Sequence, residues 1–299
     1  MRPVHRVFVT GATGFVGRAV VQALRGEGYV VRCLVRRGSE PDLRGVGAIE
    51  RVEGDVLAPQ LLDEGMAGCG AVIHLVGIIR EHIATNTTFY RVHVQGTVNV
   101  VAAAAAAGVR RYVHMSALGA RDGARSRYHQ TKWAAEEAVR ACALPWTIFR
   151  PSVIYGRGDG FVSPLVRLVR RLPVVPLVGS GRLQPVPVEQ VAQAVARALG
   201  LPAAVKQTYE VGGPDVVTLG ELVDLIGTAL GRRRILKLHV PGAVARVATR
   251  TLQALPYFPL TPDQLLMLDE DNVCDPASLP AAFGLEPLPL ATGLRRLLG

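Results

Sequence analysis

The stretch RVFVTGATGFVG, at residues 6–17, predicts how the fold of this chain begins. Residues 6–10 are mostly β-branched or aromatic, as in a buried parallel strand. Three glycines then interrupt the chain, and apolar residues recur at helical spacing from 19 to 24. A strand, a glycine turn and a helix in this order predict a nucleotide-binding site.

The glycines of this turn follow a Gly-x-x-Gly-x-x-Gly spacing rather than the Gly-x-Gly-x-x-Gly of the usual dinucleotide fingerprint. Without side chains, the backbone can approach a pyrophosphate, and the helix N-terminus offers free N–H groups and a positive dipole end. A glycine-rich turn without a ligand is the alternative. The residues predicted to bind a dinucleotide here are Thr10, Gly11, Thr13, Gly14, Phe15, Val16 and Gly17.

Length and composition indicate a globular protein. At 299 residues, 49% of them apolar, the chain is long enough for one large core and a smaller lobe, and it is not disordered. No apolar stretch reaches the roughly 18 residues that a transmembrane helix needs. The first predicted strand leaves no room for a signal peptide before it. We expect a cytoplasmic protein, with peripheral association on the inner face of the membrane as a further expectation.

The cysteines indicate the redox compartment, and the net charge indicates which classes of partner the protein could bind. Four cysteines are scattered without a Cys-x-x-Cys pair, which predicts a reducing compartment and neither a metal site nor a disulfide framework. The net charge of +10 is carried almost entirely by arginine, since only three of the 34 basic residues are lysines. Such basicity suits nucleic acid, acidic lipid or an anionic partner. No nucleic-acid-binding module is visible, so we expect no nucleic-acid partner.

Strand and helix patterns alternate over the first half of the chain. The predicted strands are 6–10, 29–35, 49–56, 71–77, 111–116 and 146–150. The predicted helices that follow the first one are 61–68, 88–107 and 128–141. This alternation predicts an α/β protein with a doubly wound parallel sheet, the Rossmann fold.

Beyond Pro151 the chain becomes richer in proline and glycine, and the regular alternation ends. We therefore predict a dinucleotide-binding domain at 1–155. Residues 156–299 are predicted to form mainly a smaller substrate or partner lobe, with segments around 183–212 returning to the first domain. Residues 243–252 fit an interfacial helix whose arginines can meet anionic lipid, or equally an ordinary helix that covers the core of the lobe.

The end of the second predicted strand indicates which cofactor is bound. Arg36 and Arg37 follow this strand, and no carboxylate appears before Glu40. A carboxylate here would bind the ribose 2′-hydroxyl of NAD, whereas arginine binds the 2′-phosphate of NADP. We predict NADP(H), with NAD(H) as the alternative cofactor. Alternatively, both arginines are ordinary surface residues in contact with solvent.

Two further strand ends carry candidate cofactor contacts. Asp55 and Val56 end the third predicted strand, where ligands collect in parallel sheets. Asp55 either contacts the adenine or caps the loop. Gly77 ends the fourth strand and suits a backbone that passes beneath a cofactor.

Tyr128 and Lys132 are the strongest catalytic candidates. Their i, i+4 spacing places both on one face of a helix, where the ammonium lowers the pKa of the phenol from about 10 towards neutrality. The tyrosine then serves as a general acid or base, and the lysine can also donate to the nicotinamide ribose. Alternatively, Tyr128 and Lys132 are a pair on the surface of the helix without a catalytic role.

Ser116 is a further candidate at the end of the fifth predicted strand. It either orients a substrate oxygen or caps the loop.

With these residues in place, the chain resembles the extended and atypical branch of the short-chain dehydrogenase/reductase superfamily. The resemblance covers about residues 5–230. Its motifs are TGATGFVG at 10–17, GDV at 54–56, Tyr128 with Lys132, RPSVIYG at 150–156 and PVEQVA at 187–192. It implies cofactor contacts from Pro151 and Val153 as well.

Within this branch, the chain is similar to the group named for the nucleotide-binding alpha-subcomplex accessory subunit of respiratory complex I. The stretches VHVQGT at 92–97, HMSALGA at 114–120 and GDGFV at 158–162 carry that similarity. It implies bound NADPH, which in the complex I subunit is thought to be structural, and an association with quinone or the respiratory chain. His93 stands where extended relatives usually have asparagine, and Ala117 is a second candidate for their serine or threonine position.

Three functions therefore follow as expectations. The first is an NADP(H)-dependent oxidoreductase that acts on a small-molecule substrate or quinone through Tyr128, Lys132 and Ser116. The second is a non-catalytic NADPH-binding accessory or assembly protein of a respiratory membrane complex. The third is a nucleotide-sugar epimerase-like enzyme. Neither the substrate nor the oligomeric state is predicted.

Overall fold

A computed structural model describes residues 5–38, 43, 45, 47–232, 234–252 and 260–299. The chain forms two compact units. The first contains Met1–Gly123, Tyr128–Pro151 and Val188–Glu210. The second contains Ala124–Arg127, Ser152–Pro187 and Val211–Gly299. The assignment of substrate or partner binding to the later part of the chain stays a prediction.

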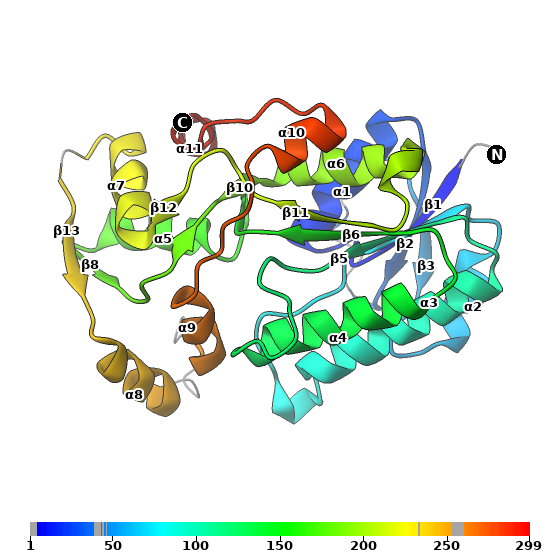
Figure 1. Cartoon of the computed structure of the whole chain (residues 1–299), viewed down its shortest axis with the longest axis horizontal. Helices are drawn as coiled ribbons and strands as arrows, with labels where there is room; N and C mark the ends of the chain where they lie inside the picture. The colour runs from blue at the N-terminus through cyan, green and yellow to red at the C-terminus, as the bar shows by residue number, and fades with distance from the viewer. Residues whose placement is uncertain (1–4, 39–42, 44, 46, 233, 253–259) are drawn as a thin grey trace. The chain divides into compact units, whose positions relative to one another are not determined.

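A seven-stranded parallel sheet forms the centre of the first unit (Figure 1). Its strands, in spatial order, are β11 (Gln207–Val211), β6 (Trp146–Pro151), β5 (Arg111–Met115), β4 (Ala71–His74), β1 (Arg6–Thr10), β2 (Val30–Val35) and β3 (Glu50–Glu53). Strand order reverses beside β1, because β4 pairs on one side of it and β2 on the other. This topology confirms the predicted doubly wound sheet.

Burial distinguishes the central strands from one edge of the sheet. Every residue of β4 and β5 is buried, whereas the edge strand β3 is not buried at any position. Helices α1 (Phe15–Gly26) and α6 (Val188–Gly200) cover one face of the sheet. Helices α2 (Gln60–Met66), α3 (Gly96–Ala106) and α4 (Arg127–Ala141) cover the other (Figure 1). Strands with helices on both faces must be apolar on both faces.

A helix covers most of the predicted range 88–107, but its first part is π-helical. A π-helix, η3 (Tyr90–Gln95), precedes α3. The wider turn buries His93, while Gly96 packs so closely that a Cβ there would lie 3.0 Å from Val56 Cγ2. Ala103 and Ala104 are buried further along α3, so small side chains bring this helix close to its neighbours.

The second unit has its own core and several short elements. Its longer helices are α5 (Val162–Arg171), α7 (Leu219–Ala229), α8 (Gly242–Leu252) and α11 (Leu290–Leu298). Its strands include the parallel pair β8 (Val174–Leu177) and β13 (Leu236–His239). Thr218 and Glu221 form a capping box that begins α7. Across the described part of the chain, no helix combines the length and apolarity needed to span a bilayer.

Candidate active site and cofactor site

The glycine turn joins β1 to α1 within four residues. Gly11 has a φ of +75°, which favours glycine, and a Cβ there would lie 3.0 Å from the backbone of Leu75 and Val76. Gly17 is still more constrained, because its Cβ would lie 2.1 Å from the carbonyl oxygen of Gly11. The first turn of α1 therefore packs directly on the loop that follows β1.

The start of α1 has the features of an anion site. Gly14 is the N-cap and offers no side-chain cap, so no side chain competes for the first N–H groups of the helix. Phe15 and Val16 begin the helix, and the carbonyl oxygen of Thr13 accepts a 3.3 Å hydrogen bond from Arg18. An uncapped helix start beside a side-chain-free loop fits the pyrophosphate of a dinucleotide.

A buried polar chain lies beneath this turn. Thr10 Oγ1 lies 2.7 Å from His74 Nδ1, and His74 Nε2 lies 3.1 Å from Thr97 Oγ1. Burial, with a smaller contribution from the charge of Lys132, lowers the pKa of His74 to about 3. His74 is therefore neutral and links β1, β4 and α3.

Lys132 is the buried cation of the candidate active site. Its side chain is only 4% exposed, and Nζ donates a 2.8 Å hydrogen bond to the carbonyl oxygen of Met115, the last residue of β5. Burial lowers the pKa of Lys132 to about 8, although Glu136 opposes this shift. A Cβ on Gly77 would lie 3.3 Å from Nζ, so a glycine lets the loop after β4 pass close to the ammonium.

Tyr128 lies one turn before Lys132 on α4 and is half-buried. Its ring meets that of His93 edge-on, with centroids 5.4 Å apart and planes at 87°. Phe89 and His129 make further edge contacts with it. Aromatic neighbours on several sides limit the rotation of the phenol.

His93 links the loop after β4 to α4. His93 Nε2 lies 3.0 Å from the backbone nitrogen and 3.1 Å from the carbonyl oxygen of Ile78, so it accepts from the N–H or donates to the carbonyl according to which ring nitrogen carries the proton. Nδ1 lies 2.9 Å from Thr131 Oγ1 and makes the complementary hydrogen bond there. Burial, then the charge of Lys132, lowers the pKa of His93 to about 2, so the ring is neutral. In the sequence, the only signal for this role is a histidine where asparagine is usual.

A buried carboxylate holds α4 against β6. Glu136 is fully buried and accepts two hydrogen bonds from Arg150, at 2.8 and 2.7 Å. Arg140 also pairs with Glu136, and both arginines lie over the ring of Trp133. A paired, desolvated carboxylate of this kind fixes the helix that carries Tyr128 and Lys132.

Ser116 directly follows β5 and lies beside the Met115 carbonyl that binds Lys132. Its hydroxyl is in a residue only 3% exposed and has no hydrogen-bond partner among the described residues. Its backbone N–H is satisfied by the carbonyl oxygen of Phe149 at 2.7 Å. A buried hydroxyl without a partner is costly, and a ligand oxygen would satisfy it. Ala117, the next residue, offers no such group.

The structure places Arg36 and Arg37 directly after β2, both exposed, and neither pairs with a residue that it describes. Gly54 donates to the carbonyl oxygen of Val35, which brings the loop after β3 beside the end of β2. Asp55 Oδ1 in that loop accepts a 2.9 Å hydrogen bond from the N–H of Leu57. Asp55 therefore caps its loop, and its adenine contact stays a prediction.

The remaining predicted contacts have other local roles. Val56 is buried, and its carbonyl oxygen accepts a hydrogen bond from Asn99. The carbonyl oxygen of Pro151 accepts one from Leu118. Val153 lies in the second unit and pairs with Val186 there. Cofactor contacts from these three residues stay predictions.

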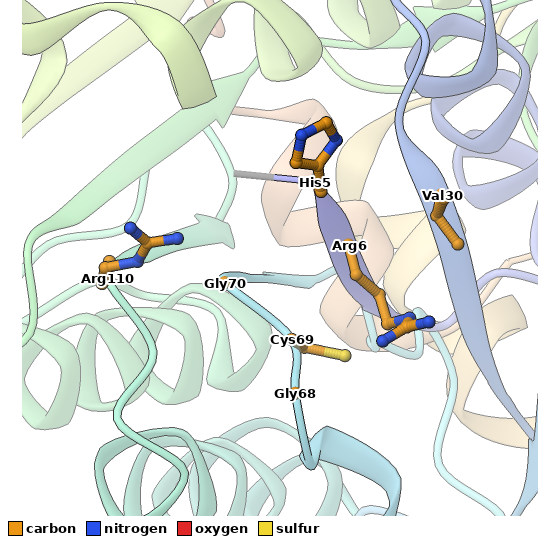
Figure 2. A pocket seen from close by; sticks show the side chains of 7 residues that line it. All are labelled: His5, Arg6, Val30, Gly68, Cys69, Gly70 and Arg110. Atoms are coloured by element: carbon orange, nitrogen blue, oxygen red, sulfur yellow. The ribbon is translucent and has the colours of Figure 1, made fainter. Parts of the chain in front are cut away.

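A separate cavity lies at the opposite edge of the sheet. It has a volume of about 350 Å³, and His5, Arg6, Val30, Cys69 and Arg110 contribute to its lining (Figure 2). These residues lie at the amino ends of their strands, whereas the candidate site lies at the carboxyl ends. Arg6 already pairs with Glu50 at 3.0 Å. The cavity is therefore not part of the candidate site.

Metal chemistry has no visible support in the described residues, which contain no group of three or more histidine, cysteine and acidic side chains arranged around one point. The glycine turn, the uncapped helix and the unpartnered Ser116 hydroxyl instead fit a dinucleotide and a substrate oxygen.

Comparison with known proteins supports this interpretation. The model of the NAD dependent epimerase/dehydratase family matches residues 7–212. The chain is 35% identical over 278 residues to NADH dehydrogenase [ubiquinone] 1 alpha subcomplex subunit 9, mitochondrial, of Arabidopsis thaliana, covering 88% of this chain and 68% of that protein. It is 40% identical over 173 residues to the ceramide reductase of Caulobacter vibrioides, covering 58% of this chain and 53% of the reductase.

Among solved structures, the Bordetella bronchiseptica enzyme WbmH in complex with NAD⁺ superposes with a TM-score of 0.76. The superposition covers 98% of this chain and 97% of that one at 20% sequence identity. At this level of identity, the likeness shows a shared fold.

Proposed function

Because the chain belongs to the NAD-dependent epimerase/dehydratase family, we propose that it is an NADP(H)-dependent oxidoreductase acting on a carbonyl or alcohol. One observation carries the proposal. Lys132 is buried, anchored at the end of β5 beside the unpartnered hydroxyl of Ser116, and one helical turn from Tyr128. These are a cation, a hydrogen-bond donor and a proton-transfer group on adjoining elements.

The chain offers groups for each part of the cofactor. The glycine turn and the start of α1 would hold the pyrophosphate, and Lys132 would donate to the nicotinamide ribose. Arg36 and Arg37, exposed and without partners among the described residues, would bind a 2′-phosphate. When bound, the nicotinamide supplies or accepts a hydride.

The protein's own residues handle the proton. Tyr128 gives its phenolic proton to the substrate oxygen during reduction and takes it back during oxidation. The Lys132 ammonium stabilises the phenolate that results, and this effect is strong because the lysine is buried. Ser116 donates its hydroxyl hydrogen to the same oxygen. His93 and the aromatic ring contacts hold the phenol in place.

The proposal is tested on purified protein. Mass spectrometry of the released nucleotide identifies the cofactor, and NADPH oxidation is then followed with a panel of carbonyls and quinones. Tyr128→Phe should lower turnover by about 10²–10⁴-fold while NADPH affinity is unchanged, because it removes only the transferable proton. Absence of turnover on the whole panel with NADPH bound would overturn the oxidoreductase proposal.

A second candidate function has one specific observation in its favour, the 35% identity with a mitochondrial NADH dehydrogenase subunit over most of the chain. Under this alternative, NADPH stabilises an accessory or assembly protein of a respiratory membrane complex. The protein would then copurify with that complex, and Tyr128→Phe would leave cellular function intact. Independence from membrane complexes in such a purification would contradict it.

The family match also supports an epimerase-like alternative. It predicts interconversion of a nucleotide sugar without net consumption of cofactor, which chromatography of the sugar products would detect.

For all three functions we propose a cytoplasmic protein able to associate peripherally with the inner face of the membrane.

A further inference from the structure

The second unit exposes an apolar sheet face. In the parallel pair β8–β13, Val174 is the partner of Leu236, and Pro176 is the partner of Leu238. The alternate residues Val175 and Leu177 are buried in the core of the unit. Val174, Pro176, Leu236 and Leu238 therefore share the opposite face, which we call the apolar sheet face. Leu236 is 52% and Leu238 59% exposed, although a solvated sheet face is normally polar.

The next element along the chain also exposes apolar side chains. Helix α8 begins three residues after β13 and buries Ala245 and Thr249. On other sides of this helix, Val244 is 56% and Val247 63% exposed. The helix thus covers the core with small residues and presents branched apolar ones to solvent. Clustered exposure of this kind marks an interaction site.

Both chain segments that form this surface are basic. Residues 161–177 contain three arginines, residues 231–252 contain six arginines and lysines, and neither segment contains an aspartate or glutamate. Lys237 pairs with Asp224 of α7 at 2.5 Å. Other cations of these segments are exposed and pair with no carboxylate among the described residues: Arg167, Arg170, Arg171, Arg234 and Arg246.

A cationic hollow adjoins the apolar sheet face. It has a volume of about 510 Å³, and Arg232, Arg234, Lys237 and His239 contribute to its lining, together with the Asp224 carboxylate that pairs with Lys237. Leu236 belongs to both the hollow and the apolar sheet face. Guanidinium groups bind phosphate oxygens in paired hydrogen bonds, so the hollow suits a phosphate group at the margin of an apolar surface.

We propose that the apolar sheet face and α8 dock on an anionic lipid bilayer, with a headgroup phosphate in the cationic hollow. Exposed apolar side chains on segments that also carry exposed arginines match the boundary between lipid headgroups and acyl chains. A specific protein partner would instead call for free polar groups of both charges. These segments contain no carboxylate, and Asp224 of α7, which lines the hollow, is already paired with Lys237. This inference rests on the peripheral membrane association proposed above and assigns a surface to it. It involves neither the cofactor nor the candidate catalytic residues, so its test is independent of the oxidoreductase proposal.

The test is co-sedimentation of the full-length protein with vesicles. We expect binding to vesicles of 30% phosphatidylglycerol in phosphatidylcholine, little binding to pure phosphatidylcholine, and release by 0.5 M salt but not by 10 mM inorganic phosphate. The double variant Leu236→Ser/Leu238→Ser should bind at least tenfold more weakly, since it removes most of the inserted apolar area. Arg234→Ala should weaken binding roughly fivefold, as expected for one interfacial arginine.

Matched controls lie on the same unit. Val216→Ser removes another exposed apolar side chain, and Arg157→Ala removes another exposed arginine, so both should bind like the parent protein. Equal binding to both kinds of vesicle, or equal loss in the controls, would overturn the proposal. Capture of an acidic protein with no vesicle binding would overturn it as well.

A second readout does not depend on the double variant being folded. Leu238→Trp in vesicles that carry brominated phosphatidylcholine should lose indole fluorescence, because the new tryptophan would lie at the acyl boundary. The parent protein, whose two tryptophans are the partly buried Trp133 and the buried Trp146, provides the background. Quenching no greater than that of the parent contradicts insertion of the apolar sheet face.

Discussion

The glycine turn after β1 and the apolar sheet face of β8–β13 are opposite kinds of surface. The turn is shaped by missing side chains, since a Cβ on Gly17 would lie 2.1 Å from a backbone oxygen. The apolar sheet face is shaped by side chains that pack against nothing in their own unit, with Leu238 59% exposed. In the glycine turn, close contact between backbone atoms therefore requires glycine. In the apolar sheet face, the proposed lipid partner explains why the exposed side chains are apolar.

The largest effect is expected at Gly17. Gly17→Val would force α1 away from the backbone of Gly11, at a cost above about 4 kcal/mol, which is exceptional for one substitution. We expect loss of nucleotide binding together with a large fall in melting temperature. Gly26→Ala in the same helix is the control, because nothing lies within 4 Å of its added Cβ. That variant should be neutral or slightly stabilised, and equal damage from both would refute the packing explanation.

Lys132 should give the protein a distinctive pH dependence. Its pKa is about 8 in the folded state against 10.5 in the unfolded state, so the unfolded state binds more protons between these values. Stability from this group therefore rises as pH rises from about 8 towards 10.5, by roughly 3 kcal/mol in all. Urea titrations should show this rise in the parent protein relative to Lys132→Met. Parallel pH profiles for the two proteins would contradict burial of the charge.

Arg36 tests the exposed part of the cofactor site. Arg36→Ala should weaken NADPH binding roughly tenfold and leave NADH binding almost unchanged, because only NADPH carries the 2′-phosphate. Fluorescence titration of both nucleotides measures the difference. Arg51→Ala, an exposed arginine on the neighbouring strand β3, is the control. Equal weakening for both nucleotides would remove the phosphate role.

The smallest effect is expected at the start of α7. Thr218→Ala should destabilise the protein by about 1 kcal/mol, because it removes the side-chain half of the capping box with Glu221. Thr251→Ala, an exposed threonine within α8, should cost less. Chemical denaturation compares the two. A larger loss of stability from Thr251→Ala would mean that the stability of α8 depends on the Thr251 hydroxyl rather than on the apolar contacts of the helix.

Most of the sheet could be predicted because central parallel strands have a simple cause. Strands covered on both faces are mostly apolar, so residues 71–77 stand out as a run interrupted only by His74, whereas β5 also buries Arg111 and His114. The Tyr128–Lys132 spacing likewise predicts a shared helical face, and α4 contains both residues. The local periodicity of the sequence is sufficient to predict a helix or strand where that element and its environment are regular.

The rest depended on contacts between distant residues. The π-helical turn around His93 has a helical pattern in sequence, and its extra residue follows from packing against the loop at Ile78 and against Thr131. Glu136 has the pattern of a surface helix residue but is buried under two arginines. The apolar sheet face could not be predicted for the same reason. Leu236 and Leu238 alternate with polar residues, a pattern that any half-buried strand shows.

The contact between Gly17 and the carbonyl of Gly11 has a consequence for how such sequences evolve. Because the helix itself touches the loop there, the glycine is needed for folding even with no nucleotide present. A descendant that abandoned the cofactor would still be selected to keep its glycines. The motif therefore outlasts the activity, and decay of an enzyme of this kind should be sought first at the Tyr128–Lys132 pair.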